Sequence, residues 1–235
     1  RNGKNCNLIL GFMSGGRSMA PSLSWLKAAR PKEFIGDGRL CSWISTVADP
    51  SGSQTLSMIA QRLDSTFTRY GFLIDNGQEL PSAFAGASIA VIAAHGGIHP
   101  EGRFFQVVSD EGILRVTAKD LANSLRNIGI AILFVCSGGR ADKHPGSHTT
   151  LGLAKDMLDR GCAAVIASPW PLDSSVPSHW LPTFLKYWQL GLPIITANFH
   201  ANNAVDKYFS HNPAKGLAMT IFGNPMLRKL NSPIS

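Results

Sequence analysis

Short apolar runs and amphipathic helical segments alternate along the chain from Leu40 to Phe222. The apolar runs have the length of buried strands and occupy residues 40–47, 72–74, 88–94, 128–135, 163–167 and 217–222. Apolar residues recur at helical spacing between these runs, in segments 56–70, 117–125, 151–158, 180–188 and 196–208. Such alternation predicts an α/β fold with a largely parallel sheet and helices on both faces.

Two parts of the chain depart from this alternation. Phe104–Val108 and Ile113–Val116 are joined by a short polar turn, which predicts a hairpin outside the main sheet. The beginning of the chain has a single apolar run, Leu8–Met13, followed by a Gly/Ser/Pro-rich stretch that suggests one strand at most. We therefore expect residues 1–39 to be an N-terminal extension or linker and residues 40–235 to form one domain.

Composition and charge support this division. With 235 residues and 44% hydrophobic content, the chain can bury the core of one large domain. Residues 1–39 hold seven basic and two acidic residues of a chain whose net charge is +7, so the remainder is nearly neutral. The basic residues are scattered among Gly, Pro and Trp, which favours a solvated linker or docking segment over a nucleic-acid site. Because the chain begins with Arg1 rather than Met, we expect it to be cut from a longer polypeptide or processed.

Neither a membrane span nor a disulfide framework is predicted. No apolar run approaches the roughly 18 residues needed to cross a bilayer, and no signal peptide precedes the first run, so we expect a soluble cytoplasmic protein. Four cysteines stand at positions 6, 41, 136 and 162 without a C-x-x-C pair. We expect Cys6, Cys41 and Cys162 to be structural.

Two reactive side chains directly follow buried strands. His95 follows one strand and Cys136 follows another, 41 residues later, with a hairpin and a helix between them that would bring the strands side by side. Ligands of open parallel sheets lie at the carboxyl ends of strands. A cysteine attacks as its thiolate and a nearby imidazole can manage its proton, so the pair predicts a nucleophile and a base.

Glycines surround both residues. Gly96 lets the backbone approach a bound carbonyl, and its N–H and that of Cys136 are candidates for holding an oxyanion. Gly138 and Gly139 keep the approach to the sulfur uncrowded.

Four stretches together resemble a known family: Ser88–Gly97, Ile132–Gly139, Gly152–Asp173 and Ala218–Pro225. They are similar to the CHAT domain, a caspase-like family that is also related to separase. The resemblance covers about residues 40–228, and its last stretch resembles the family's terminal strand with Phe-Gly-Asp-Pro.

The resemblance implies a caspase-haemoglobinase fold and a cysteine endopeptidase acting on protein substrates, without a metal or other cofactor. His95 matches the family's catalytic histidine and Cys136 its nucleophile. Family members are often attached to tetratricopeptide repeats or other sensor modules, so a regulatory module acting upstream or in trans is also implied.

The Trp170-Pro-Leu-Asp173 stretch matches a family motif near the substrate cleft. Asp173 either faces a basic residue before the scissile bond or caps the helix that contains Trp180. Trp170 is a pocket wall or a core residue, and Ser137, next to the nucleophile, is a further candidate for substrate binding.

Two departures from the family keep an alternative open. Ser137-Gly138-Gly139 stands where many members have an acidic residue and then Thr-Gly, and Asn224 replaces the usual Asp. The alternative is a catalytically inactive caspase-like scaffold or signalling module.

A metal site is the other rival, because His95 and His99 are four residues apart, as are His144 and His148. Both pairs fall in Gly/Pro-rich loops, where this spacing has no helical meaning. The interpretation therefore favours thiol chemistry without a metal.

Overall fold

The chain has an α/β fold in which a mixed, largely parallel sheet carries helices on both faces, as predicted. A computed structural model describes residues 36–44, 54–75, 84–98, 104–108, 114–136, 138, 142–143 and 150–229, together with 8–11, 17–20 and 27. Along the main path of the sheet the strands are β1 (Leu8–Gly11), β2 (Arg17–Ala20), β12 (Thr220–Gly223), β11 (Ala164–Ala167), β8 (Ile130–Val135), β5 (Ile89–Ile98), β3 (Leu40–Ile44) and β4 (Leu73–Asp75).

The centre of this sheet is parallel. Strands β11, β8, β5, β3 and β4 pair in parallel, whereas β12 runs antiparallel to β11. The predicted neighbours β5 and β8 are confirmed as a directly paired couple, in register from Ile89↔Ile130 to Ala94↔Val135. Equivalent positions of the two strands therefore reach the same edge of the sheet.

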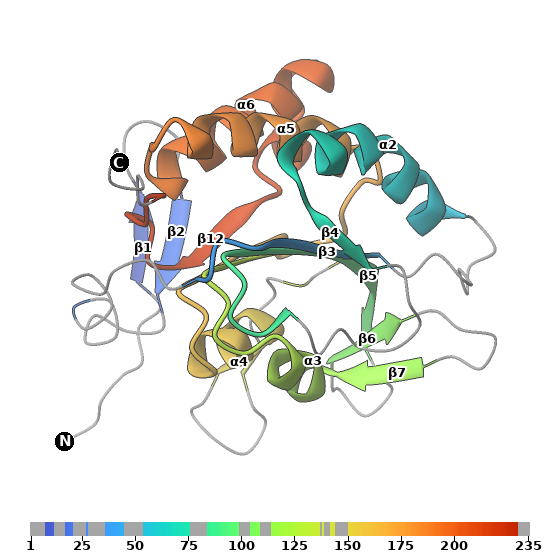
Figure 1. The fold of residues 1–235 in the computed structure, drawn as a ribbon, viewed down its shortest axis with the longest axis vertical. Helices are drawn as coiled ribbons and strands as arrows, with labels where there is room; N and C mark the ends of the chain where they lie inside the picture. Colours follow the sequence, from blue (N-terminus) through green and yellow to red (C-terminus); the bar gives the residue numbers. More distant parts are fainter. Residues whose placement is uncertain are drawn as a thin grey trace.

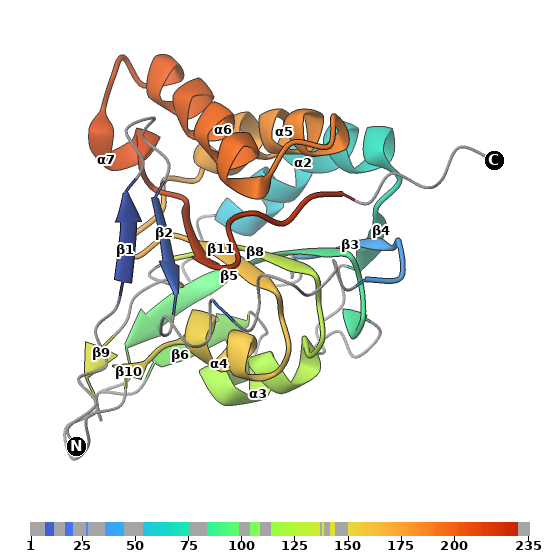
Figure 2. The same ribbon diagram turned by 90° about the vertical axis from the view of Figure 1, so that its left-hand side faces the viewer.

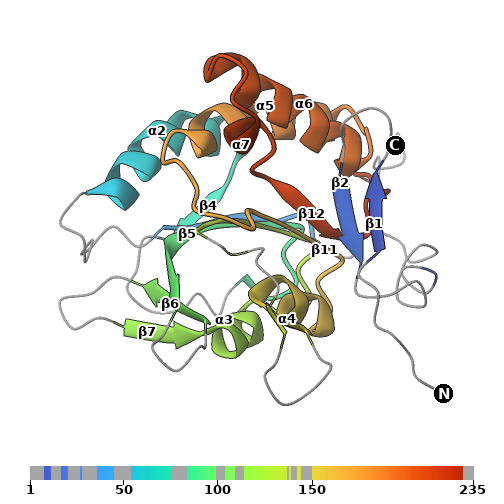
Figure 3. The same ribbon diagram turned by 180° about the vertical axis from the view of Figure 1, so that it is seen from behind.

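Two helical layers enclose the sheet (Figures 1 and 3). One layer contains α2 (Thr55–Tyr70), α5 (Val176–Gln189) and α6 (Ile194–Tyr208), and the other α3 (Ala118–Ser124) and α4 (Leu153–Asp159). The predicted stop of α2 at Gly71 is confirmed by a left-handed backbone, with φ of 71°. The remaining elements are the short helix α7 (Pro213–Gly216), the hairpin β6 (Phe104–Val108) and β7 (Leu114–Thr117), and the small pair β9 (Asp142–Lys143) and β10 (Thr150–Leu151).

Strand side chains alternate between the two layers. In β8, Ile130, Ile132 and Phe134 belong to the core beneath α2, α5 and α6, and the residues between them belong to the core beneath α3 and α4. Phe134 meets Trp180 of α5 edge to face, with ring centroids 6.0 Å apart. A strand buried on both faces reads as a continuous apolar run, which explains why β5 and β8 are prominent in the sequence.

One expectation about β5 is wrong. The apolar run predicts that the strand ends at His95, but β5 continues to Ile98. From His95 onward it leaves the parallel sheet and pairs antiparallel with β6, beginning with His95↔Val107. The predicted β6–β7 hairpin is thereby confirmed, and its attachment to β5 explains the longer strand.

The N-terminal segment contains two strands rather than the single strand suggested by its composition. Strands β1 and β2 form an antiparallel hairpin, and β2 pairs in parallel with β12 through Ser18↔Ile221 and Met19↔Phe222. The division at residue 39 stays a prediction, although this part of residues 1–39 contributes to the sheet. None of the helices in the described part of the chain has both the length and the apolar character needed to cross a bilayer.

Candidate active site

His95 and Cys136 come next to each other because of the β5–β8 register. The last paired residues of the two parallel strands are Ala94 and Val135, and His95 and Cys136 each follow directly. The predicted reactive pair therefore stands at equivalent positions on neighbouring strands. At this point β5 turns towards β6 and β8 enters a turn, so the sheet opens beside both residues.

The alternation of β5 assigns the side chain of His95 to one face of the sheet. Ile89, Val91 and Ala93 of β5 lie in the core beneath α2, α5 and α6, and continuing this series assigns His95 to that face. Phe134 of β8 lies in the same core, and Cys136 follows the end of β8 in a turn. Unlike the buried strand residues before them, His95 and Cys136 are half-buried.

Cys136 stands in a tight turn. The amide of Gly138 donates a hydrogen bond of 3.0 Å to the carbonyl of Val135, so Cys136 is the first central residue of a four-residue turn. Gly138 is buried, and a Cβ on it would lie 3.2 Å from the same carbonyl oxygen. The small residue at position 138 lets the turn close tightly.

Gly96 is required by a close approach of two backbones. A Cβ at this position would lie 2.2 Å from the carbonyl oxygen of Cys136, a distance that real side chains do not tolerate. The main chain directly after His95 therefore packs on the main chain of Cys136. This contact couples the two reactive residues more closely than their strand register alone.

The loop after β11 reaches the same edge of the sheet. Since β11 is parallel to β8, with Ala167 beside Leu133, residues 168–175 leave the sheet at the edge where Cys136 lies. Figure 2 shows α7 on this side, towards which the arrow of β5 points. The loop and α7 are joined by two contacts, which involve Trp170 and Asp173.

Both carboxylate oxygens of Asp173 accept hydrogen bonds. Its Oδ2 pairs with Lys215 Nζ of α7 at 2.6 Å, and its Oδ1 accepts the amide of Ser175 at 2.9 Å. Burial by itself would raise the pKa of Asp173, but the hydrogen bonds from Lys215 and Ser175 outweigh it and hold the pKa below its ordinary value. The carbonyl of Asp173 also accepts the amide of Val176, but the N-cap of α5 is Ser175, which makes no side-chain cap hydrogen bond. Asp173 therefore borders the start of α5 without capping it as predicted, and its contact with substrate stays a prediction.

Trp170 is anchored to α7 rather than buried in the core. Its indole Nε1 donates a hydrogen bond of 2.9 Å to the carbonyl of Ala214, and the residue remains 36% exposed. Lys215 and Ala214 were not found by sequence reasoning, because each lies more than 40 residues from its partner and carries no recognisable motif. Ser137 lies outside the described residues, so its predicted contact with substrate stays a prediction.

Comparison with known families assigns the chain to one of them. The sequence model of the CHAT domain matches residues 53–213, which is more than half of the chain and includes His95, Cys136 and the 168–175 loop. The chain belongs to the CHAT domain family. The terminal Ala218–Pro225 stretch lies beyond the matched range, and no curated protein matches the sequence significantly.

Solved structures show the same fold for this CHAT domain. The separase of Saccharomyces cerevisiae in complex with securin superposes with a TM-score of 0.62 at 16% identity, over 89% of this chain and 14% of that chain. The Arg-specific cysteine proteinase gingipain R reaches a TM-score of 0.50 at 17% identity, over 83% of this chain and 50% of that chain. The chain thus spans about one seventh of the separase and half of the gingipain, and the predicted caspase-like fold is confirmed.

Two further cysteines of the CHAT domain are structural, as predicted. Cys162 is buried beside β11 and its Sγ lies 3.3 Å from the carbonyl of Leu125. Burial raises the pKa of Cys162 to about 12, and burial also raises the pKa of the Cys41 thiol. Cys6 lies outside the described residues.

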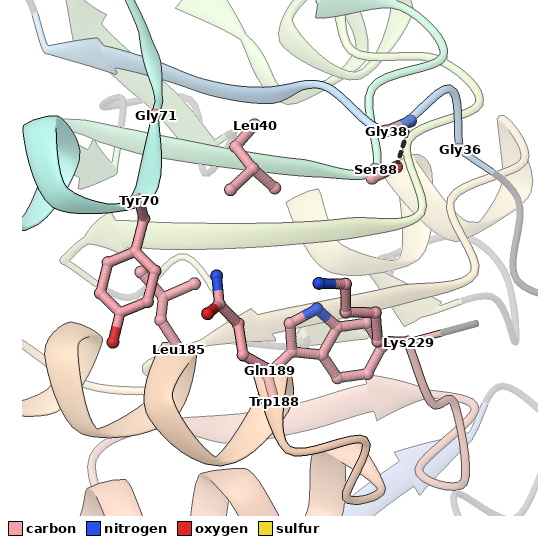
Figure 4. A pocket seen from close by; sticks show the side chains of 10 residues that line it. All are labelled: Gly36, Gly38, Leu40, Tyr70, Gly71, Ser88, Leu185, Trp188, Gln189 and Lys229. Atoms are coloured by element: carbon pink, nitrogen blue, oxygen red, sulfur yellow. Dashed lines mark hydrogen bonds between the residues drawn. The ribbon is translucent and has the colours of Figure 1, made fainter. Parts of the chain in front are cut away.

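No metal centre is found in the described part of the CHAT domain, where His, Cys, Asp and Glu do not gather in threes. His99, His144 and His148 of the rival metal hypothesis lie outside that part. A cavity of about 390 Å³ lies between Leu40, Ser88 and Trp188 (Figure 4). Because Leu40 begins β3 and Ser88 precedes β5, this cavity is at the opposite edge of the sheet from His95 and Cys136.

Proposed function

We propose that this CHAT domain is a cysteine endopeptidase in which Cys136 is the nucleophile and His95 manages its proton. The observation that carries the proposal is the β5–β8 register, which ends one residue before each of them. The close packing of Gly96 on the Cys136 carbonyl supports a fixed relation between the two. Membership of the CHAT family and the fold shared with two cysteine peptidases make peptide hydrolysis the reaction to test.

The proposed reaction proceeds through an acyl-enzyme. The thiol proton passes to His95 as Sγ of Cys136 bonds to the substrate carbonyl carbon, and the resulting oxyanion is held by the amides of Gly96 and Cys136. The carbon–nitrogen bond then breaks as His95 returns the proton to the leaving amine. Water attacks the thioester, His95 takes one of its protons, and the acid product and the free thiol are released.

We propose that the 168–175 loop and Ser137 border the substrate cleft, with Trp170 as a wall and Asp173 as an acidic group near the scissile bond. Gingipain R is described as Arg-specific, so peptides with a basic residue before the scissile bond are the first substrates to test. In this chain Lys215 already pairs with Asp173. A basic substrate side chain would therefore have to share or displace an internal cation.

We further propose that another protein or an attached module controls the domain. The solved separase is in complex with securin, which is an example of a protein partner for this fold. A tetratricopeptide or other sensor module, upstream or in trans, is the arrangement that the family resemblance suggests. A cytoplasmic location also stays a prediction.

Labelling with peptide acyloxymethyl ketones tests the proposal. The wild type, Cys136→Ala and His95→Ala would be treated with a panel of probes that differ in the residue before the warhead. We expect labelling of the wild type and its loss in both variants, because a thiolate and its base are both required. His211→Ala, which removes an exposed histidine, is the matched control and should label normally.

The outcome separates an enzyme from a scaffold. Equal labelling of the wild type and His95→Ala would contradict the proposed dyad. A folded full-length protein that no probe labels, even with its own sensor module present, would instead support the inactive scaffold.

A further inference from the structure

A groove between α2 and α5 concentrates positive charge. It has a volume of about 490 Å³, and its lining includes Arg62 and Arg69 of α2 and Lys186 of α5 but no Asp or Glu. Figures 1 and 2 show the two helices beside each other in the layer that covers the sheet. All three cationic side chains are exposed.

These cations have only neutral partners among the described residues. Arg62 donates a hydrogen bond of 3.2 Å to Ser175 Oγ, Arg69 lies over the Tyr70 ring and Lys186 over the Tyr187 ring. None of the ion pairs between described residues involves them. The nearest carboxylate along α2, that of Asp64, borders a different surface hollow. The groove is therefore an uncompensated patch of positive charge.

Two hydroxyl groups of the groove are already engaged in hydrogen bonds along α5. The hydroxyls of Ser178 and Thr183 donate to carbonyls of their own helix, those of Ser175 and His179. His179 does not line the groove, although burial, and then the positive charge of Arg62, lower its pKa. The charge that attracts an anion to the groove is that of Arg62, Arg69 and Lys186.

The charges stand at the two ends of the groove. Arg62 contacts the residue that precedes α5, whereas Tyr70 at the end of α2 borders the same cavity as Trp188 near the end of α5 (Figure 4). The two helices thus run side by side in the same direction. Arg62 and Arg69 are seven residues apart, which is about 10 Å along a helix. One phosphate group is too small to contact both ends.

An extended peptide has the matching repeat. In a polyproline II conformation, residues three apart lie on the same side of the chain and about 9 Å apart. We propose that the α2–α5 groove binds an acidic, extended peptide segment of a partner protein, with carboxylates three residues apart that contact Arg62 at one end and Arg69 and Lys186 at the other. This binding site does not depend on the proposed peptidase activity.

Fluorescence anisotropy would test the site with the full chain. The probe is a labelled dodecapeptide with Glu at every third position and Gly and Pro between. The groove variant combines Arg62→Gln, Arg69→Gln and Lys186→Gln. The matched control combines Lys119→Gln, Arg126→Gln and Lys207→Gln, which removes the same charge from exposed positions outside the groove. We expect the groove variant to weaken binding about tenfold or more and the control less than about twofold.

Salt and competing probes complete the test. Because exposed charges are screened, binding should fall steeply between about 50 mM and 500 mM salt. Equal weakening by both triple variants would overturn the proposal, since it would reveal attraction to net charge alone. Tighter binding of a single-stranded oligonucleotide with the same number of charges, again lost in the groove variant, would also overturn it in favour of a nucleic acid.

Discussion

The cysteine thiols of this chain differ in burial, so their rates of alkylation test, at the scale of single residues, the roles assigned to them. The thiol of Cys136 is half-buried at the open edge of the sheet, whereas that of Cys162 is buried and its pKa is about 12 instead of 9.0. Such a shift lowers the thiolate fraction about a thousandfold. With iodoacetamide near pH 7.5, we expect Cys136 to be alkylated first and Cys162 and Cys41 only after unfolding, as peptide mass spectrometry would measure.

Unfolding the protein in urea before adding the reagent provides the control for this experiment. All cysteines should then react at similar rates, because burial no longer protects any of them. If Cys162 reacted as fast as Cys136 in the folded protein, the assignment of the two cysteines to structural and reactive roles would be wrong.

Gly96 gives a second prediction at this scale. Gly96→Ala would force a methyl group to within 2.2 Å of the Cys136 carbonyl oxygen, so one of the two strand ends must move. A displacement of about 1 Å can cost about 100-fold in rate, and we expect a loss of that size in acyloxymethyl ketone labelling. Thermal unfolding of the same variant separates this effect from loss of the fold.

Gly138→Ala is the matched comparison, because its nearest contact is 3.2 Å and only a small adjustment is needed. We expect it to label more rapidly than Gly96→Ala. A folded Gly96→Ala variant that labels at the wild-type rate would show that the backbone contact does not position the dyad.

At the scale of elements, the pair between Asp173 and Lys215 ties the loop after β11 to α7. Both side chains are about one-third exposed, so solvent screening limits the pair to about 0.5–1 kcal/mol. We expect Asp173→Asn to lower the free energy of urea unfolding by about that amount at pH 7. Because the folded-state pKa of Asp173 is lowered, its stabilisation is complete above the unfolded pKa near 3.8 and is lost as the pH falls through the folded value.

The difference in unfolding free energy between wild type and Asp173→Asn should therefore shrink when the measurement is repeated near pH 2.5. Asp64→Asn, on the exposed side of α2 and without an ion pair among the described residues, should change little at either pH. A difference that stayed constant with pH would mean that the carboxylate charge is not what stabilises the loop.

Most elements could be predicted from the sequence, and the exceptions have a common cause. Strands β5 and β8 are buried on both faces, so their apolar runs are visible and the residues that follow them, His95 and Cys136, stand out. The continuation of β5 past His95 could not be predicted, because a glycine such as Gly96 is expected both in a turn and in a strand that passes close to another backbone. That glycine is explained by a contact with a residue 40 positions away.

The side-chain partners of the loop after β11 could not be predicted, for the same reason. The WPLD stretch identified Trp170 and Asp173 as candidates, but nothing local indicated that α7 would supply Ala214 and Lys215 to them. The α2–α5 groove was likewise invisible, since its cations come from two helices separated by more than 100 residues. Sequence patterns find reactive residues next to strong elements, whereas specificity and docking surfaces arise from contacts between distant segments.

At the scale of the whole molecule, one sheet contains both the edge with His95 and Cys136 and the β1–β2 hairpin. Composition alone assigned this hairpin to an extension or linker. Strand β12 is buried and pairs with β11 on one side and with β2 on the other. Without β2, the backbone groups of Ile221 and Phe222 would face solvent along an open sheet edge. The contribution of the hairpin decides whether residues 1–39 are an extension or part of the domain.

Removing residues 1–35 tests this directly. We expect the shortened chain to unfold at a lower temperature, by about 2–4 °C for each kcal/mol of lost pairing, and to self-associate more as its concentration rises. Scanning calorimetry and light scattering would measure the two effects. Since β11 and β12 border the loop that contains Trp170 and Asp173, a destabilised edge should also slow labelling of Cys136. If the shortened chain instead unfolded and labelled like the full chain, the hairpin would be an appendage and the domain boundary would lie near residue 40, as the sequence alone suggests.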